Sequence, residues 1–155
     1  MEINMVIFKK ANDNQIERLV EISKAAFDTD IEVGASEVGG PPDYDCMKWH
    51  RQMCKNGNLY VLMKDEAIVG GAIIFEDEKD ADIVYVGRIF VDPLQYCKGY
   101  GKEIMQQIEK VDAEKHIFWL ETPVWNQRTN SFYPKCGYEE MYRDEESVYY
   151  QKALG

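Results

Sequence analysis

The sequence is short of basic residues and of long apolar runs, and each shortage excludes a class of protein. Its 155 residues include 18 Lys and Arg against 28 Asp and Glu, a formal net charge of −10. Proteins that coat duplex nucleic acid gain affinity by neutralising phosphates with Lys and Arg, so we expect no nucleic-acid partner. No stretch approaches roughly 18 uninterrupted apolar residues, so we expect no membrane span. The acidic charge attracts cationic partners, or only keeps the protein in solution.

The four cysteines form no familiar metal or disulfide motif. None belongs to a CxxC pair, and although His50 lies midway between Cys46 and Cys54, no second ligand pair completes a zinc site. The amino-terminal residues lack the apolar run and small-residue cleavage site of a secretory signal. We therefore expect no bound metal and a protein of the reducing cytoplasm.

Length and composition are those of one globular domain. A chain of 155 residues can bury about 68–70% of its unfolded surface, enough for a core without covalent cross-links. Hydrophobic residues make up 45% of the chain and charged residues 30%, and no repeat or linker divides it. We predict a single domain over residues 1–155.

The spacing of apolar residues predicts a mixed α/β (α+β) fold. Strands are expected at 5–11, 59–64, 67–76, 81–91 and 116–124, followed by a terminal hairpin over 138–152. Helices are expected from Asn12 to about residue 28, at 45–55, over the stripe Ile104–Val111, and before Gly137. This order indicates a mostly antiparallel sheet of six to seven strands with helices on both faces. Residues 28–45 are irregular in composition, with Gly, Pro and six acids.

The most informative segment is 89–105, in which a strand leads through a loop with Gly99 and Gly101 into a helix. Glycines let backbone amides converge, and a helix amino terminus adds partial positive charge, so the segment suits a pyrophosphate. Lys98 and Lys102 can add positive charge. A Rossmann loop would need a small residue at Ile104, and a Walker A loop would need Gly at Tyr96, so both are excluded. A glycine-rich turn without a ligand is the alternative.

Three pieces of the chain resemble the GNAT superfamily of acetyl-coenzyme A dependent N-acetyltransferases. These are the strand end Val91-Asp92-Pro93, the loop Gly99-Tyr100-Gly101, and the stretch from Asn126 through Tyr133 to Gly137-Tyr138. Their mutual spacing and the order of strands and helices also fit. The resemblance implies a splayed pair of central parallel strands, and dimers are common in the family. One departure is Tyr96, where the family usually has Gln or Arg.

The resemblance also implies roles for individual residues. Backbone groups of the strand would hold the pantetheine arm at Ile89, Phe90 and Val91. The loop would hold the pyrophosphate at Cys97, Lys98, Gly99, Tyr100, Gly101 and Lys102. Asn126 would hydrogen-bond the arm, cap a helix, or do both. Tyr133 would act as the general acid that protonates the leaving thiolate, or would only pack beside Phe132.

The expected reaction is direct attack of a primary amine on the thioester of acetyl-coenzyme A. The general base is not evident, with Tyr85, Glu121 and Glu76 as alternatives, and Arg88 could serve cofactor, acceptor or a salt bridge. The acceptor is a small molecule or a protein amine. The acids of residues 28–45 favour a small cationic amine, or they are merely solvated. The other function considered is a degenerate member of the fold that binds acyl-coenzyme A as a sensor or interaction module.

Overall fold

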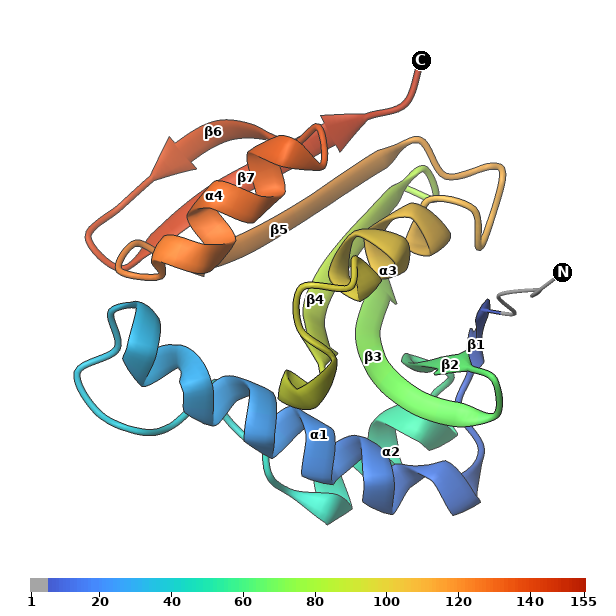
Figure 1. The fold of residues 1–155 in the computed structure, drawn as a ribbon. Helices are drawn as coiled ribbons and strands as arrows, with labels where there is room; N and C mark the ends of the chain where they lie inside the picture. Colours follow the sequence, from blue (N-terminus) through green and yellow to red (C-terminus); the bar gives the residue numbers. More distant parts are fainter. Residues whose placement is uncertain (1–5) are drawn as a thin grey trace, which may run out of the picture.

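A single seven-stranded sheet organises the chain in the computed structural model, which describes residues 6–155 (Figure 1). The strands are β1 (Val6–Lys10), β2 (Leu59–Lys64), β3 (Ala67–Glu76), β4 (Ile83–Val91), β5 (Ile117–Pro123), β6 (Glu139–Arg143) and β7 (Ser147–Ala153). Their order is β1-β2-β3-β4-β5-β7-β6, and every neighbouring pair is antiparallel except β4 with β5. The predicted mixed, mostly antiparallel sheet is confirmed. Residues 1–5, which include the first residue of the predicted strand 5–11, lie outside the described residues.

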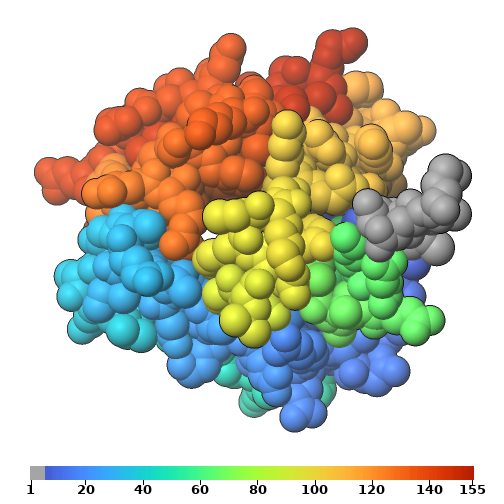
Figure 2. Space-filling model, viewed as in Figure 1, coloured from blue at the N-terminus to red at the C-terminus, as the bar shows by residue number. Residues whose placement is uncertain are grey.

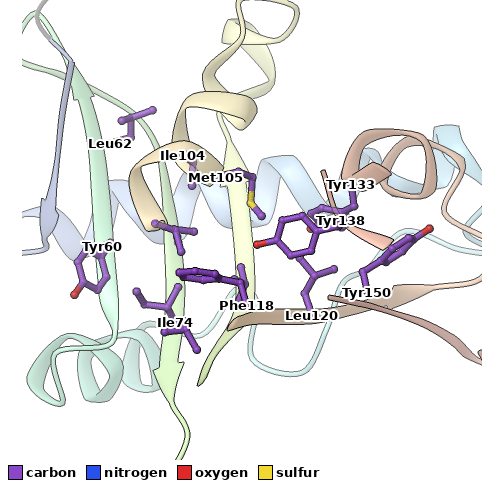
Figure 3. Close-up of a cluster of buried hydrophobic side chains, with 14 of the residues drawn as sticks. Tyr60, Leu62, Ile74, Ile104, Met105, Phe118, Leu120, Tyr133, Tyr138 and Tyr150 are labelled. Carbon is purple, nitrogen blue, oxygen red and sulfur yellow. The ribbon is translucent and has the colours of Figure 1, made fainter. Parts of the chain in front are cut away.

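Helices cover both faces of the sheet, as the sequence predicted (Figure 1). The helices are α1 (Ile16–Asp28), α2 (Met47–Lys55), α3 (Tyr100–Ile108) and α4 (Gln127–Lys135), with short 3-10 helices η1 (Asp13–Gln15), η2 (Thr29–Val33) and η3 (Pro93–Gln95). Against α1 and α2 the sheet buries Leu59, Val61, Ile73 and Phe90. Against α3 and α4 it buries Leu62, Ile74, Phe118 and Leu120, which Figure 3 shows beside Ile104 and Met105. None of the helices in residues 6–155 is long and apolar enough to cross a bilayer.

The end of α3 and the conformation of residues 29–33 differ from the sequence prediction. The predicted stripe extended to Val111, but α3 ends at Ile108 and Val111 is 43% exposed. Residues 29–33, which composition indicated as irregular, form η2, whose first hydroxyl, Thr29 Oγ1, donates to the Ala26 carbonyl. A single turn of 3-10 helix needs no apolar periodicity, so the sequence pattern carried no signal for it.

The central parallel strands separate soon after they meet. Ladder pairs join β4 to β5 only at Ile83–Tyr85 and Ile117–Trp119, while both strands continue well beyond (Figure 1). The register between β3 and β4 shifts so that Gly87 is an extra residue, a β-bulge that bends β4. The end of β4 is therefore an unpaired edge facing β5, which is the splay that the family resemblance implied.

The core between β5 and α3 offers a direct test of this packing. Leu120 is 1% exposed, so Leu120→Ala should lower the free energy of unfolding by about 2–5 kcal/mol through lost burial and a residual cavity. Leu94 is 84% exposed, and Leu94→Ala should change the free energy of unfolding by no more than about 0.5 kcal/mol. Urea denaturation of both variants measures the difference. Equal losses would contradict the described core.

Candidate active site

A cavity of about 810 Å³ lies where β4 and β5 separate. Its walls come from the end of α1, η2, the loop over residues 35–41, the end of β4, the loop 95–102, the end of β5 and the start of α4. Figure 2 shows the surface hollowed between the cyan, yellow and orange segments that correspond to these parts of the chain. The cavity thus joins segments that are far apart in the sequence, at the edge left open by the splay.

The loop before α3 is held in shape by its first residue. Asp92 is buried, accepts a hydrogen bond from the Leu94 amide at 3.0 Å and pairs with Arg18 at 2.8 Å. Further along, Cys97 (φ 67°) and Gly99 (φ 85°) adopt left-handed backbone conformations, a geometry that turns successive amides toward one side. The first amides of a helix have no partner within it, so α3 contributes donors at the same place.

The predicted pyrophosphate residues reach this cavity with one exception. Its lining includes Cys97, Gly99, Tyr100, Gly101 and Lys102. Lys98 is not among the lining residues, because its Nζ turns back to donate to Gln95 Oε1 at 2.9 Å. A Cβ on Gly101 would lie 3.3 Å from the Phe132 ring, so a larger residue there would require this ring to shift by a few tenths of an ångström.

The predicted β4 residues all line the cavity, but in different ways. Ile89 and Val91 are half-buried, while Phe90 is 3% exposed and its side chain packs into the core beneath α1. Phe90 therefore offers mainly its backbone to a ligand. The paired side of β4 faces β3, with Ala72 opposite Ile89, and the other side faces the gap toward β5.

Asn126 caps α4, as one of its two predicted roles requires. Its Oδ1 accepts from the Thr129 amide at 3.0 Å, and the side chain is buried and lines the cavity. Tyr133, two turns further along α4, also lines the cavity. Figure 3 shows it close to Tyr138 and Tyr150, whose ring centroids lie 6.1 and 5.9 Å away. Tyr133 is therefore a packing residue as well as a cavity residue.

The environment of Tyr133 keeps its phenol protonated at neutral pH. Burial raises the pKa of Tyr133 well above its ordinary value, and the neighbouring Cys136 and Asp30 add to the rise. A protonated phenol can donate a proton to an anion that forms beside it.

Tyr96 takes part in a set of non-covalent contacts with Thr29 and Arg128 that the sequence did not reveal. The Arg128 guanidinium lies 5.0 Å from the centre of the Tyr96 ring, and Arg128 Nη1 donates to Thr29 Oγ1 at 3.0 Å. The Tyr96 hydroxyl lies 3.4 Å from Thr29 Oγ1. A cation thus stands beside the position where the family usually has Gln or Arg, but it comes from α4. This role of Arg128 is visible only in the folded chain, where three segments that are distant in the sequence come together.

Two acids of residues 28–45 line the cavity, and the other four do not. The lining acids are Asp30 and Glu37. Burial raises the pKa of Asp30 to about 6, while the charge of Arg128 and a hydrogen bond from the Asn126 side chain oppose that rise. The sequence had placed Asp30 in the acidic loop without distinguishing it, because its burial depends on contacts with α4.

A second cavity, of about 430 Å³, continues from the first at the β4 bulge, and Gly87, Arg88 and Glu121 line both. Arg88 lies 4.3 Å over the Trp49 ring and donates to the Pro42 carbonyl. Among the predicted base candidates, Tyr85 lines the second cavity and donates to Glu121 Oε1 at 3.4 Å. Glu76, the third candidate, lines neither cavity.

Comparison with known proteins agrees with this architecture. The model of the acetyltransferase (GNAT) family matches residues 16–138, so the chain belongs to that family. An uncharacterised Bacillus subtilis protein, YkzC, is 28% identical over 87 residues, which span 56% of this chain and 61% of that protein.

Solved structures share the whole fold at low sequence identity. A GNAT family acetyltransferase from Streptococcus agalactiae superposes with a TM-score of 0.83 at 17% identity, covering 97% of this chain and 96% of that one. PaiA N-acetyltransferase from Thermoplasma acidophilum, solved in complex with coenzyme A, superposes with a TM-score of 0.78 at 16% identity. The match covers 97% of this chain and 99% of that one. An acetyltransferase from Thermus thermophilus superposes with a TM-score of 0.80 at 10% identity, and the match covers 99% of this chain and 100% of that one.

The glycine loop can be tested by adding charge to it. Gly101→Glu places a carboxylate and extra bulk in the cavity wall, where phosphate oxygens would bind, so coenzyme A affinity should fall at least about tenfold. Gln106 is exposed on the same helix and away from the cavity, so Gln106→Glu should leave that affinity unchanged. Titration calorimetry measures both. Wild-type affinity in Gly101→Glu would show that the pyrophosphate binds elsewhere.

Proposed function

We propose that the protein transfers an acetyl group from acetyl-coenzyme A to a primary amine by direct attack. The observation that carries the proposal is the cavity between β4 and β5, which is lined by the loop before α3 at one end and by Tyr133 along its wall. Family membership supports acetyltransfer in general.

The residues present suit an acetyl-coenzyme A molecule. The loop amides, the start of α3 and Lys102 would hold the pyrophosphate, and the uncovered edge of β4 would pair with the pantetheine arm as an added strand does. Asn126 would bond the same arm while it caps α4. Acetyl-coenzyme A supplies the activated acetyl thioester.

The chain's own groups would then lower the barrier to attack. A backbone amide near Ile89 would donate to the thioester carbonyl oxygen and stabilise the charge that develops on it. Tyr133 would give its proton to the departing sulfur and be reprotonated afterwards. No enzyme nucleophile is needed, because the amine attacks the thioester itself.

A panel of amines tests the proposal directly. Free thiol should be released from acetyl-coenzyme A only when an acceptor amine is present, and the acetylated amine should appear in equal amount. The competing function, a degenerate acyl-coenzyme A sensor, has Tyr96 at a motif position in its favour. Tight binding of acetyl-coenzyme A without thiol release for any amine would select the sensor.

Removal of one hydroxyl tests the general acid. Tyr133→Phe keeps most of the packing with Tyr138 and Tyr150 but removes the proton donor, so kcat should fall by about 10²–10⁴-fold while the Kd for coenzyme A changes little. Tyr138 is equally buried but does not line the cavity, so Tyr138→Phe should keep its kcat. An unchanged kcat in Tyr133→Phe, where chemistry limits turnover, would remove Tyr133 from the mechanism.

We further propose that the acceptor is a small cationic amine bound beside residues 28–45. Asp30 and Glu37 line the cavity on that side, and the chain carries a net charge of −10. Both features raise the local concentration of cations. A protein amine as the acceptor, a homodimer and a cytoplasmic location stay predictions from the sequence.

Salt and charge neutralisation test this acceptor class. The acceptor KM should rise with ionic strength, because exposed charges are screened over about 8–10 Å at physiological salt. Glu37→Gln should raise the acceptor KM by about two- to fivefold, as expected for one exposed charge pair, and leave that for acetyl-coenzyme A unchanged. Glu32 does not line the cavity, so Glu32→Gln is the matched control. A neutral or acidic best acceptor with a salt-independent KM would contradict the idea.

A further inference from the structure

Asp30 is a carboxylate in the wall of the cavity, and the role proposed for it so far is only to attract a cationic acceptor. It lines the same space as Asn126, Arg128 and Tyr133. Of the acids in residues 28–45, Asp28 pairs with Lys24 at 2.5 Å and accepts a hydrogen bond from the Tyr44 hydroxyl at 2.7 Å. The negative charge of Asp28 is therefore already balanced by a neighbouring cation. Asp30 has no ion pair of this kind among the described residues. Its position favours a task inside the cavity.

The backbone around Asp30 is fixed against the start of α4. The Asp30 carbonyl accepts from the amides of Gly34 and Ala35, which closes a turn over residues 30–35. Gly34 has φ 125°, and a Cβ there would lie 2.2 Å from the Trp125 carbonyl oxygen. The turn therefore lies directly on the residue before Asn126. The bond from Arg128 to Thr29 fastens the preceding residue as well.

Several charged and titratable groups act on Asp30. From α4 come Arg128, which favours the ionised carboxylate, Asn126, which hydrogen-bonds it, and Tyr133, whose own ionisation Asp30 opposes. Burial dominates and disfavours the charge, so the pKa is raised to about 6. A carboxylate with that pKa is ionised at pH 7 yet is a better proton acceptor than a solvated one.

We propose that Asp30 is the general base that deprotonates the acceptor amine in the cavity, an inference that rests on the proposed acetyltransfer. Asp30 on η2 would then accept the proton of the amine, and Tyr133 on α4 would donate a proton to the leaving sulfur. Glu121 is exposed where the two cavities join and accepts from Tyr85, and Glu76 lines neither cavity. Burial raises the pKa of Tyr85 above its ordinary value, which makes it protonated and unable to serve.

The protons balance with this assignment. The bound ammonium gives one proton to the Asp30 carboxylate, and its nitrogen lone pair forms the C–N bond to the acetyl carbon. The C–S bond breaks and the sulfur takes a proton from Tyr133. The second nitrogen proton passes to water as the amide forms, and Tyr133 takes one proton back from water. Asp30 returns its proton to water, so each turnover releases one proton.

The dependence of kcat/KM on pH tests the proposal with the best amine of the panel. In the wild type kcat/KM should rise to a plateau through an apparent pKa near 6, because protonated Asp30 cannot accept a proton. In Asp30→Asn it should be about 10²–10⁴-fold lower at pH 7. It should then climb about tenfold per pH unit toward the pKa of the amine, since only the neutral amine reacts. Asp30→Glu should restore a plateau.

A stability measurement separates a base from a structural carboxylate. The folded-state pKa of Asp30 lies above its unfolded value, so its contribution to stability is present below pH 3.8 and is lost as pH rises through about 6. At pH 8 the Tm of Asp30→Asn should therefore equal or exceed that of the wild type. Glu32 lies in the same 3-10 helix outside the cavity, so Glu32→Gln should keep the wild-type pH profile.

The outcomes distinguish this inference from the proposed function. Absence of amine-dependent thiol release in the wild type would remove the proposed function and the base together. An active wild type with the same pH profile in Asp30→Asn, whatever its Tm, would remove Asp30 alone. A lost plateau in Asp30→Asn that Asp30→Glu restores, with unchanged coenzyme A affinity, would establish the base.

Discussion

The short ladder between β4 and β5 is the constraint on which the site depends. After the pairs at Ile83–Tyr85 and Ile117–Trp119 the strands part, and the bulge at Gly87 bends β4 away. A full ladder would satisfy every amide and leave no space. The open edge costs stability unless something else pairs with it, since buried backbone groups demand partners. The proposed pantetheine arm, which carries amide groups, would pair with this edge and complete the sheet.

A second constraint joins the two halves of the cavity wall. Thr29 at the end of α1, Tyr96 in the loop before α3, and Arg128 in α4 meet in one polar contact. These segments otherwise have separate cores, one beneath α1 and one beneath α3 and α4. The contact therefore connects Tyr96 to Thr29, the first residue of η2, which also carries Asp30. The residue that departs from the family motif thus contacts the same segment as the proposed general base.

The sequence predicted most of the fold because its signals are local. The spacing of apolar residues located the strands, and Asn12 marked the start of the first helical region, where its amide donates to Gln15 Oε1 at 2.9 Å. The glycine loop and Asn126 were found by spacing. Lys98 was expected to face the anion site, but its preference for Gln95 is a rotamer choice that no pattern encodes. Asp30 and Arg128 depend on contacts between distant segments, so only the folded chain reveals them.

The tryptophans are distributed in a way that has an optical consequence. Trp125 lines the first cavity and Trp49 lines the second beneath Arg88. Trp119 stacks on Tyr85, which also lines the second cavity, with ring centroids 4.2 Å apart. These are all three of the tryptophans in the chain. The natural fluorescence of the protein therefore originates in the walls of the two cavities and directly beside the second. A molecule that enters either cavity can therefore be followed by the emission of a tryptophan in its wall, without any attached label.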